Sequence, residues 1–279
     1  MRGARPERAL DAVIRSAARF ERGARVCIAC SGGPDSVALA SLADRLGRTG
    51  EYDVVLAHVN HGVRASADQD ECVVLSVAAR LGRRVVVAHP VVGRKDEATL
   101  RAARYDALAR LAGDAGAGFV ATAHTAEDQT ETVLLALFRG TGPDGLAGMP
   151  ARRALGGGIE LIRPLLRVTH AELATELHRS GLPYALDPTN AGARYRRGAL
   201  RGPLDALRAE FPHLDRAVAR CAEIARGELD GTERAQARRA LRERLRAEDA
   251  LRDVPFERIE AALDAAERAA RSAERGTRS

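Results

Sequence analysis

The sequence predicts an α/β fold, a parallel β-sheet with helices on both faces, followed by a small C-terminal helical region. Three observations support this prediction. Short apolar runs alternate with segments of helical periodicity through the first half of the chain. The apolar runs are continuous, as expected of strands that are covered on both faces. After about residue 208 strand-like runs disappear, and charged helical segments take their place.

The predicted elements follow one another in a regular order after an amphipathic N-terminal helix. The strands are expected at 26–30, 53–59, 84–89 and 118–123, and the helices at 34–46, 68–81, 97–112 and 126–138. Gly47 is expected to close the helix at 34–46. Residues 139–158 are rich in glycine and are expected to form loops. A further helix at 169–180 begins with a capping box of Thr169 and Glu172 and ends at Gly181.

The composition of the 279 residues favours a soluble protein with a polyanionic partner. The formal net charge is +6, which favours such a partner without proving one. Lys95 is the only lysine, so the positive charge is carried by arginine. No apolar run approaches the roughly 20 residues of a membrane span. The charged N-terminus lacks the apolar segment of a signal peptide, so we expect a cytoplasmic protein that does not associate with a membrane.

Four cysteines raise the question of a metal or redox pair, because Cys27 and Cys30 have CxxC spacing. They lie in an apolar run that reads as a strand. Residues three apart on a strand point to opposite faces, so these two side chains cannot converge. We therefore expect small buried side chains, and no disulfides.

A strand-to-helix turn with the sequence SGGPDS provides the clearest local sign of chemistry. Two glycines allow the backbone to approach a ligand closely, and Pro34 suits the first turn of a helix. The free N–H groups of that turn form an anion site. Asp35 would repel an anion there unless a cation such as Mg²⁺ lay between them. The alternative is an ordinary strand-to-helix turn. The turn contains neither a Walker-type loop nor a dinucleotide fingerprint.

A second group of polar residues, His124, Asp128 and Glu131, follows the strand at 118–123. On a helix their spacing would place them on one face. His124 lies where that strand ends, at the edge of the sheet where open α/β sheets bind ligands. The alternatives are a solvated acidic helix face and a zinc site, for which a third strong ligand is lacking at a suitable spacing.

The SGGPDS turn resembles the pyrophosphate-binding loop, SGGxDS, of the N-type ATP pyrophosphatases. More specifically, the first 210 residues resemble the tRNA(Ile)-lysidine synthases. Besides SGGPDS, the matching stretches are HVNHGVRASADQDE (58–71), EATLRAARYDALA (97–109), ATAHTAEDQTETVLLALFRGTGPDGLAGM (121–149), LIRPLLRVTHAEL (161–173) and DPTN (187–190). The resemblance implies a fold like that of the adenine nucleotide alpha hydrolases, with a catalytic domain at 1–208 and a small helical domain or tail at 209–279.

The resemblance also implies a reaction. In that family the wobble cytidine of a CAU anticodon is adenylated on its C2 oxygen by ATP, with release of pyrophosphate. The ε-amine of free L-lysine then attacks C2 and AMP leaves. Carboxylates can orient the lysine and help to deprotonate it. The implied cofactors are ATP and Mg²⁺, and the implied partner is tRNA(Ile).

The resemblance assigns roles to particular residues. It implies that ATP is held by Ser31, Gly32, Gly33, Pro34, Asp35 and Ser36, with Asp35 on the metal. The lysine site it implies comprises Arg104, His124, Asp128 and Glu131. Arg197 and Arg201 are further catalytic candidates that would stabilise charge on the nucleotide. Arg104 could equally be a solvated helix arginine.

The chain departs from the family pattern after residue 190. Gly198 stands where an asparagine is expected, and Pro203 lies where a helix would run on. Longer family members carry a further C-terminal domain that grips the acceptor stem. We therefore expect this chain to recognise tRNA through its helical tail, as a homodimer, or with less stringency.

Other functions remain open on the sequence alone. A tRNA 2-thiolation enzyme of the same superfamily would need catalytic or cluster-binding cysteines, and their spacing here is not that of a cluster. A non-catalytic nucleotide- or RNA-binding module would gain nothing from Asp35. A small-molecule amidotransferase would need a glutaminase partner.

Overall fold

The computed structural model contains a six-stranded sheet with strand order β3-β2-β1-β4-β6-β5. It describes residues 6–18, 20, 23–62, 67–93, 96–186, 196–233, 236–238, 240–241, 258–259, 261–266 and 268. The strands are β1 (Arg25–Ala29), β2 (Asp53–Val59), β3 (Val85–Ala88), β4 (Phe119–Ala121), β5 (Arg152–Gly156) and β6 (Ile159–Ile162). All neighbours pair in parallel except β5, which lies antiparallel to β6 at one edge.

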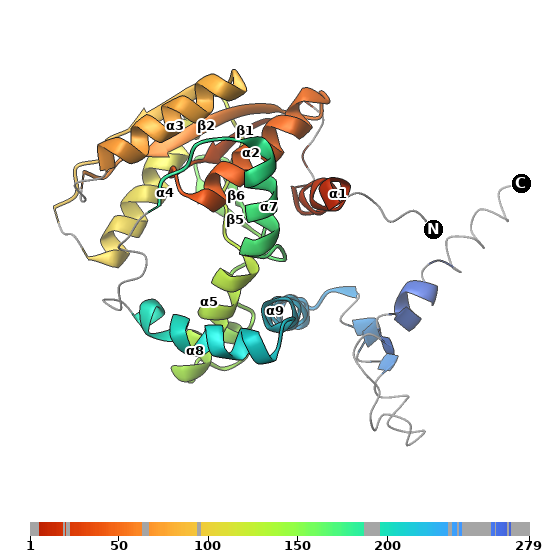
Figure 1. Ribbon diagram of the computed structural model, residues 1–279. Coiled ribbons are helices and arrows are strands. Elements are labelled where there is room, and N and C mark those ends of the chain that lie inside the picture. The colour runs from red at the N-terminus through yellow and green to blue at the C-terminus, as the bar shows by residue number, and fades with distance from the viewer. Residues whose placement is uncertain are drawn as a thin grey trace, which may run out of the picture.

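Helices cover both faces of the sheet (Figure 1). They are α1 (Pro6–Ala18), α2 (Pro34–Arg48), α3 (Ala67–Leu81), α4 (Glu97–Asp114), α5 (Ala126–Phe138), α6 (Gly142–Leu146), α7 (His170–Ser180), α8 (Arg196–Glu210) and α9 (Leu214–Leu229). One apolar core joins the sheet to α1, α2, α3 and α7, and a second joins its other face to α4. The predicted fold class is therefore confirmed.

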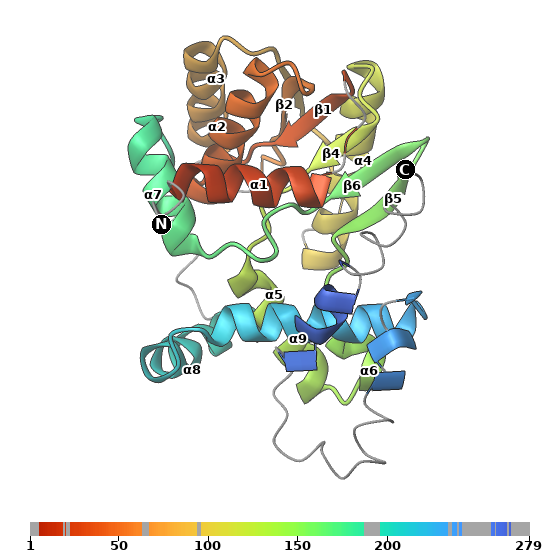
Figure 2. The ribbon, with the colours of Figure 1, turned by 90° about the vertical axis from the view of Figure 1, so that its right-hand side faces the viewer.

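Four helices gather beyond the edge of the sheet. Figure 2 shows α8 and α9 together with α5 and α6, below the sheet and the helices that cover it. α9 packs against both α5 and α6, and α8 packs against α5. α8 runs across residue 208, so the boundary between 208 and 209 stays a prediction. Among the described residues, no helix is long and apolar enough to cross a membrane.

Most predicted elements occur within two residues of their expected bounds, but two expectations were wrong. Gly47 does not end α2, which continues to Arg48. A Cβ on Gly47 would lie 3.1 Å from the Tyr52 carbonyl oxygen, so this glycine serves close packing, and Gly50 has the left-handed backbone. Residues 139–158 are rich in loops, as expected, and also contain α6 and β5. Helix α8 continues through Pro203, with the next residue, Leu204, fully buried.

Candidate active site

The carboxyl ends of β1 and β4 lie side by side at the point where the strand order reverses. In open α/β sheets this switch point is the usual ligand site, because the loops on its two sides diverge and leave a crevice. The loop after β1 is the predicted phosphate loop, and the loop after β4 carries His124. The fold thus brings the two predicted sites next to each other, although 90 positions separate them in the sequence.

The phosphate loop has the geometry of an anion cradle. Gly32 has a φ of +86°, and a Cβ there would approach the Asp70 carbonyl oxygen to 3.0 Å, so only glycine fits. The Ser36 hydroxyl donates to the Gly33 carbonyl at 2.8 Å and accepts the Ser31 N–H at 3.1 Å. Pro34 opens α2, and no side chain caps this helix. The first-turn N–H groups therefore remain available to a bound anion.

Asp35 lies in the first turn of α2, at the mouth of this cradle. Its Oδ1 atom lies 3.1 Å from Nδ1 of His170, the first residue of α7. The carboxylate is about one-third exposed, so it can reach a ligand outside the loop. Mg²⁺ in nucleotide sites uses one or two carboxylates together with phosphate oxygens and water. Asp35 beside a phosphate cradle fits that donor set.

His170 was not predicted as a site residue. Burial by itself lowers the pKa of its imidazole, but the hydrogen bond and charge of Asp35, with the carboxylates of Glu127 and Asp128, raise that pKa to about 9. At neutral pH the pair is therefore an ion pair, in which a histidine cation balances the acid beside the phosphate cradle.

The raised pKa of His170 predicts a pH-dependent contribution to stability. An unfolded histidine titrates near 6.5, so the contribution is complete below about pH 6.5 and is lost as the pH rises through about 9. The stability advantage of the wild type over His170→Asn should therefore be larger at pH 6 than at pH 9.5. Urea denaturation at the two pH values measures it, and an advantage that does not change with pH would contradict the assignment.

The second site differs from its prediction in one respect. His124 precedes α5 and lies in the loop after β4, so it does not share a helix face with Asp128 and Glu131. Its Nδ1 atom lies 2.9 Å from the Thr122 hydroxyl. Burial lowers the pKa of His124 to about 3; Asp128 raises it, whereas Arg163, Arg104 and Arg101 lower it further. The imidazole is therefore neutral at neutral pH.

The two acids of this site are held differently. Asp128 accepts the Thr125 N–H at 2.9 Å, so one of its oxygens serves the capping box of α5. Glu131 is 7% exposed, and its Oε1 atom lies 3.6 Å from Nε of Arg201 on α8. Arg201, a catalytic candidate from the sequence, thus lies in contact with Glu131, and its role stays a prediction. The side chain of Arg197 and residues 187–190 lie outside the described residues.

Glu127, which the sequence did not single out, connects the two halves of the site. Its Oε1 atom accepts the backbone N–H of His170 at 2.9 Å. Its other oxygen, Oε2, is buried without a hydrogen-bond partner among the described residues. The chain of contacts therefore runs from Asp35 through His170 to the first turn of α5. Arg163, just after β6, was also missed, because β6 itself was not predicted from the sequence.

The CxxC cysteines do not form a site. Cys27 belongs to the apolar core on the α4 face, and Cys30 to the core on the α2 face. Their side chains therefore lie on opposite faces of β1, as predicted, and both thiols are buried and free. Burial raises the pKa of both thiols, that of Cys27 to about 11.

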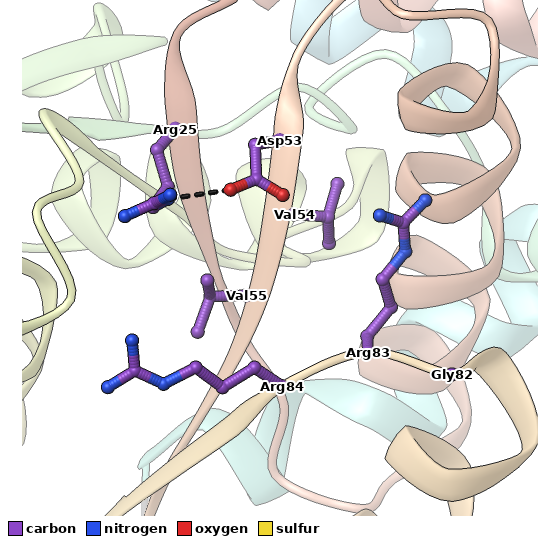
Figure 3. Close-up of a pocket in the computed structure, with 7 residues that line it drawn as sticks. All are labelled: Arg25, Asp53, Val54, Val55, Gly82, Arg83 and Arg84. Carbon is purple, nitrogen blue, oxygen red and sulfur yellow. Dashed lines mark hydrogen bonds and ion pairs between the residues drawn. The ribbon is translucent and has the colours of Figure 1, made fainter.

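A pocket at the opposite edge of the sheet is unrelated to these residues. It is lined by the amino ends of β1 and β2 and by the turn before β3 (Figure 3). Arg25 and Asp53 face each other across it, with Nε and Oδ2 2.6 Å apart. Arg83 is bound to Asp44. Arg25 and Arg83 are thus each paired with a carboxylate, and Arg84 also lines the pocket.

Comparison with known proteins identifies the family of this chain. Residues 5–206 match the model of the PP-loop domain family, which covers both halves of the site. The chain belongs to the PP-loop family. In this PP-loop domain the loop after β1 is the predicted phosphate loop, at residues 31–36.

Curated relatives of this PP-loop chain are named tRNA(Ile)-lysidine synthase. One from Methylobacterium sp. strain 4-46 is 44% identical over 193 residues, which cover 66% of this chain and 54% of that protein. One from Salinispora tropica is 45% identical over 184 residues, covering 63% and 54%. The chain thus spans just over half the length of these relatives.

A solved PP-loop structure is similar in fold at low sequence identity. The U34-tRNA thiolase NcsA from Methanococcus maripaludis, described with its [4Fe-4S] cluster, gives a TM-score of 0.66 at 16% identity. The alignment covers 78% of each chain. At this identity the likeness supports the fold alone.

Proposed function

We propose that this PP-loop chain converts the wobble cytidine of tRNA(Ile) to lysidine, using ATP and free L-lysine. The observation that carries the proposal is the contact between the two half-sites: the phosphate cradle after β1 and the buried acids of α5, after β4, lie next to each other and are joined through His170 and Glu127. A synthase of this type needs a leaving-group site and an amine site on either side of one reacting base. The relatives' name, tRNA(Ile)-lysidine synthase, supports tRNA(Ile) as the RNA and lysidine as the product.

In the first step the cytidine O2 attacks the α-phosphate of ATP, and pyrophosphate leaves. The first-turn N–H groups of α2 and the Gly32–Gly33 backbone hold the departing phosphates. Asp35 would hold Mg²⁺, which supplies neutralisation of the phosphate charge when bound. Asp35 would then contact the metal as well as His170.

In the second step the lysine ε-amine attacks C2, and AMP leaves with the former cytidine oxygen. Glu131 and Asp128 orient the incoming ammonium and take up its proton, because only the free amine is a nucleophile. With a pKa of about 3, His124 is a weak base. Its part is to hold and orient a neighbouring group through a hydrogen bond. Arg104 belongs to the lysine site, and Arg197 and Arg201 offset negative charge beside the nucleotide.

The proposal includes a cellular setting. The enzyme would act in the cytoplasm on a tRNA with a CAU anticodon, with 1–208 as the catalytic domain and 209–279 as a helical appendage. The same proposal includes a homodimer, in which the second copy could supply additional RNA contacts.

The products of ATP cleavage test the proposal against other kinds of ATP use. AMP and pyrophosphate should appear only when tRNA is present, and their release should require Mg²⁺. Release of ADP and orthophosphate would rule out a pyrophosphatase mechanism. Thin-layer separation of products from α- and γ-labelled ATP distinguishes the two results.

The cysteines provide a test against the thiolation alternative. Cys30 is 2% exposed and lies 3.8 Å from the Ser36 hydroxyl, close to the phosphate loop. Cys30→Ser should retain turnover within about threefold of the wild type, with a stability loss of about 1 kcal/mol from burying a hydroxyl. Turnover and thermal melting of Cys30→Ser and Cys27→Ser check this. A folded but inactive Cys30→Ser protein would instead favour a thiolation enzyme.

A further inference from the structure

Several arginines surround the ring of Tyr105 on α4. The guanidinium carbons of Arg101 and Arg104, also on α4, each lie 5.3 Å from the ring centroid. That of Arg153 on β5 lies 4.6 Å from it. Arg163, just after β6, approaches the same phenol closely enough to affect its pKa. We call Arg101, Arg104, Arg153 and Arg163 the arginine cluster.

Three members of the arginine cluster carry positive charge without a carboxylate partner among the described residues. In the part of the chain that the structure describes, Arg104, Arg153 and Arg163 form no ion pair with a carboxylate. Arg163 is 3% exposed. It donates to the Pro150 carbonyl at 2.7 Å, while its Nε atom is buried without a hydrogen-bond partner among those residues. Like charges held this close repel one another, so a bound anion would stabilise the cluster.

The register of the edge strand separates Arg153 from its neighbour. Arg152 pairs with Ile162 and forms an ion pair with Glu160, whereas Arg153 pairs with Leu161, whose side chain belongs to the core on the α4 face. Successive strand residues point to opposite faces. Arg153 therefore extends over Tyr105 on the α4 side, exposed to solvent.

The arginine cluster also lies at the catalytic edge of the sheet. Arg101 and Arg104 occupy the first half of α4, which follows the carboxyl end of β3. Arg163, Arg104 and Arg101 all act on the pKa of His124. His61 lies beyond the carboxyl end of β2, and its pKa is lowered by burial and, to a smaller extent, by the charge of Arg104. An anion held by the arginine cluster would therefore lie at the same edge of the sheet as His124.

We propose that the arginine cluster binds a backbone phosphate of the RNA strand that carries the target base. This inference rests on the proposed function and adds to it the surface that positions the RNA. Two exposed arginines on different elements, backed by a buried one, suit a phosphate that arrives from solvent on a large molecule. The carboxylate of free lysine would need only one guanidinium, and it would not need an arginine on an exposed edge strand.

Arg153→Ala provides the test, with binding of unmodified tRNA(Ile) transcript measured without ATP or lysine. Binding should weaken about 5- to 10-fold, as for the loss of one phosphate contact. The slope of log K against log salt should become shallower by about 0.7 to 0.9. Arg153→Lys keeps the charge and should keep the slope. The control is Arg110→Ala, an exposed arginine elsewhere on α4, which should change neither.

The possible outcomes distinguish failure of the RNA-phosphate inference from failure of the proposed function on which it rests. If the wild type binds the transcript and Arg153→Ala binds it equally well, the inference is overturned and the proposed function stands. If the wild type binds no RNA, both are overturned. If Arg153→Ala keeps its RNA affinity but requires more lysine, the cluster holds the amino-acid carboxylate, and the RNA assignment is wrong.

Discussion

Asp35→Asn should reduce single-turnover pyrophosphate release by at least about 100-fold, because a lost metal ligand removes several kcal/mol of transition-state stabilisation. The asparagine keeps the size of the side chain but loses the charge that would attract Mg²⁺. It also loses the ion pair with His170, a partly exposed pair whose loss should lower stability without unfolding the protein. The mutant should therefore fold normally and fail in the first chemical step.

Two comparisons make this expectation specific. Asp114→Asn removes the same charge at an exposed position near the end of α4 and should leave pyrophosphate release unchanged. Raising Mg²⁺ should partly restore Asp35→Asn, since a weakened metal site can still be filled at higher concentration. A folded Asp35→Asn protein that releases pyrophosphate at the wild-type rate would show that Asp35 has no metal role.

Glu131→Gln should weaken the use of lysine about 10- to 150-fold, as expected for the loss of one charge-assisted contact of 1.5–3 kcal/mol. The lost charge would face an ammonium and not the triphosphate, so adenylated tRNA should still form. It should accumulate when lysine is limiting. The structure adds that Glu131 is buried and contacts Arg201, so the isosteric amide is the least disruptive change.

The measurement follows α-labelled ATP onto the RNA while lysine is titrated. Glu223→Gln, an exposed acid on α9, serves as the matched control and should behave as the wild type. Wild-type lysine dependence in folded Glu131→Gln would remove Glu131 from the lysine site. Loss of the adenylate itself would instead place Glu131 on the ATP side.

The parts of the fold that the sequence predicts well are those with a local cause. Parallel strands covered on both faces appear as continuous apolar runs, and the capping box at Thr169 and the stop at Gly181 were found for the same reason. The β5–β6 hairpin was missed because β5 is short and mostly exposed. Gly47 was misread because its role is a close contact with Tyr52 across a turn, and not a helix end.

The residues of the candidate site likewise differ in how well the sequence predicts them. The phosphate loop is one contiguous segment, so its residue types alone indicate its chemistry. His170 meets Asp35 across 135 positions, and no periodicity reveals such a contact. The contact of Arg201 with Glu131 likewise depends on how α8 packs against α5. Residues that act by meeting across the fold can be assigned only after the chain is folded.

The central claim is that this chain joins lysine to a tRNA base. The protein should be incubated with ATP, Mg²⁺, radiolabelled lysine and an unmodified isoleucine tRNA with a CAU anticodon. We expect label that stays with the RNA after denaturation, requires ATP, and is absent when the wobble cytidine is replaced by uridine. Stable transfer of label that ignores this replacement, or no transfer by protein that binds both ATP and tRNA, would contradict it.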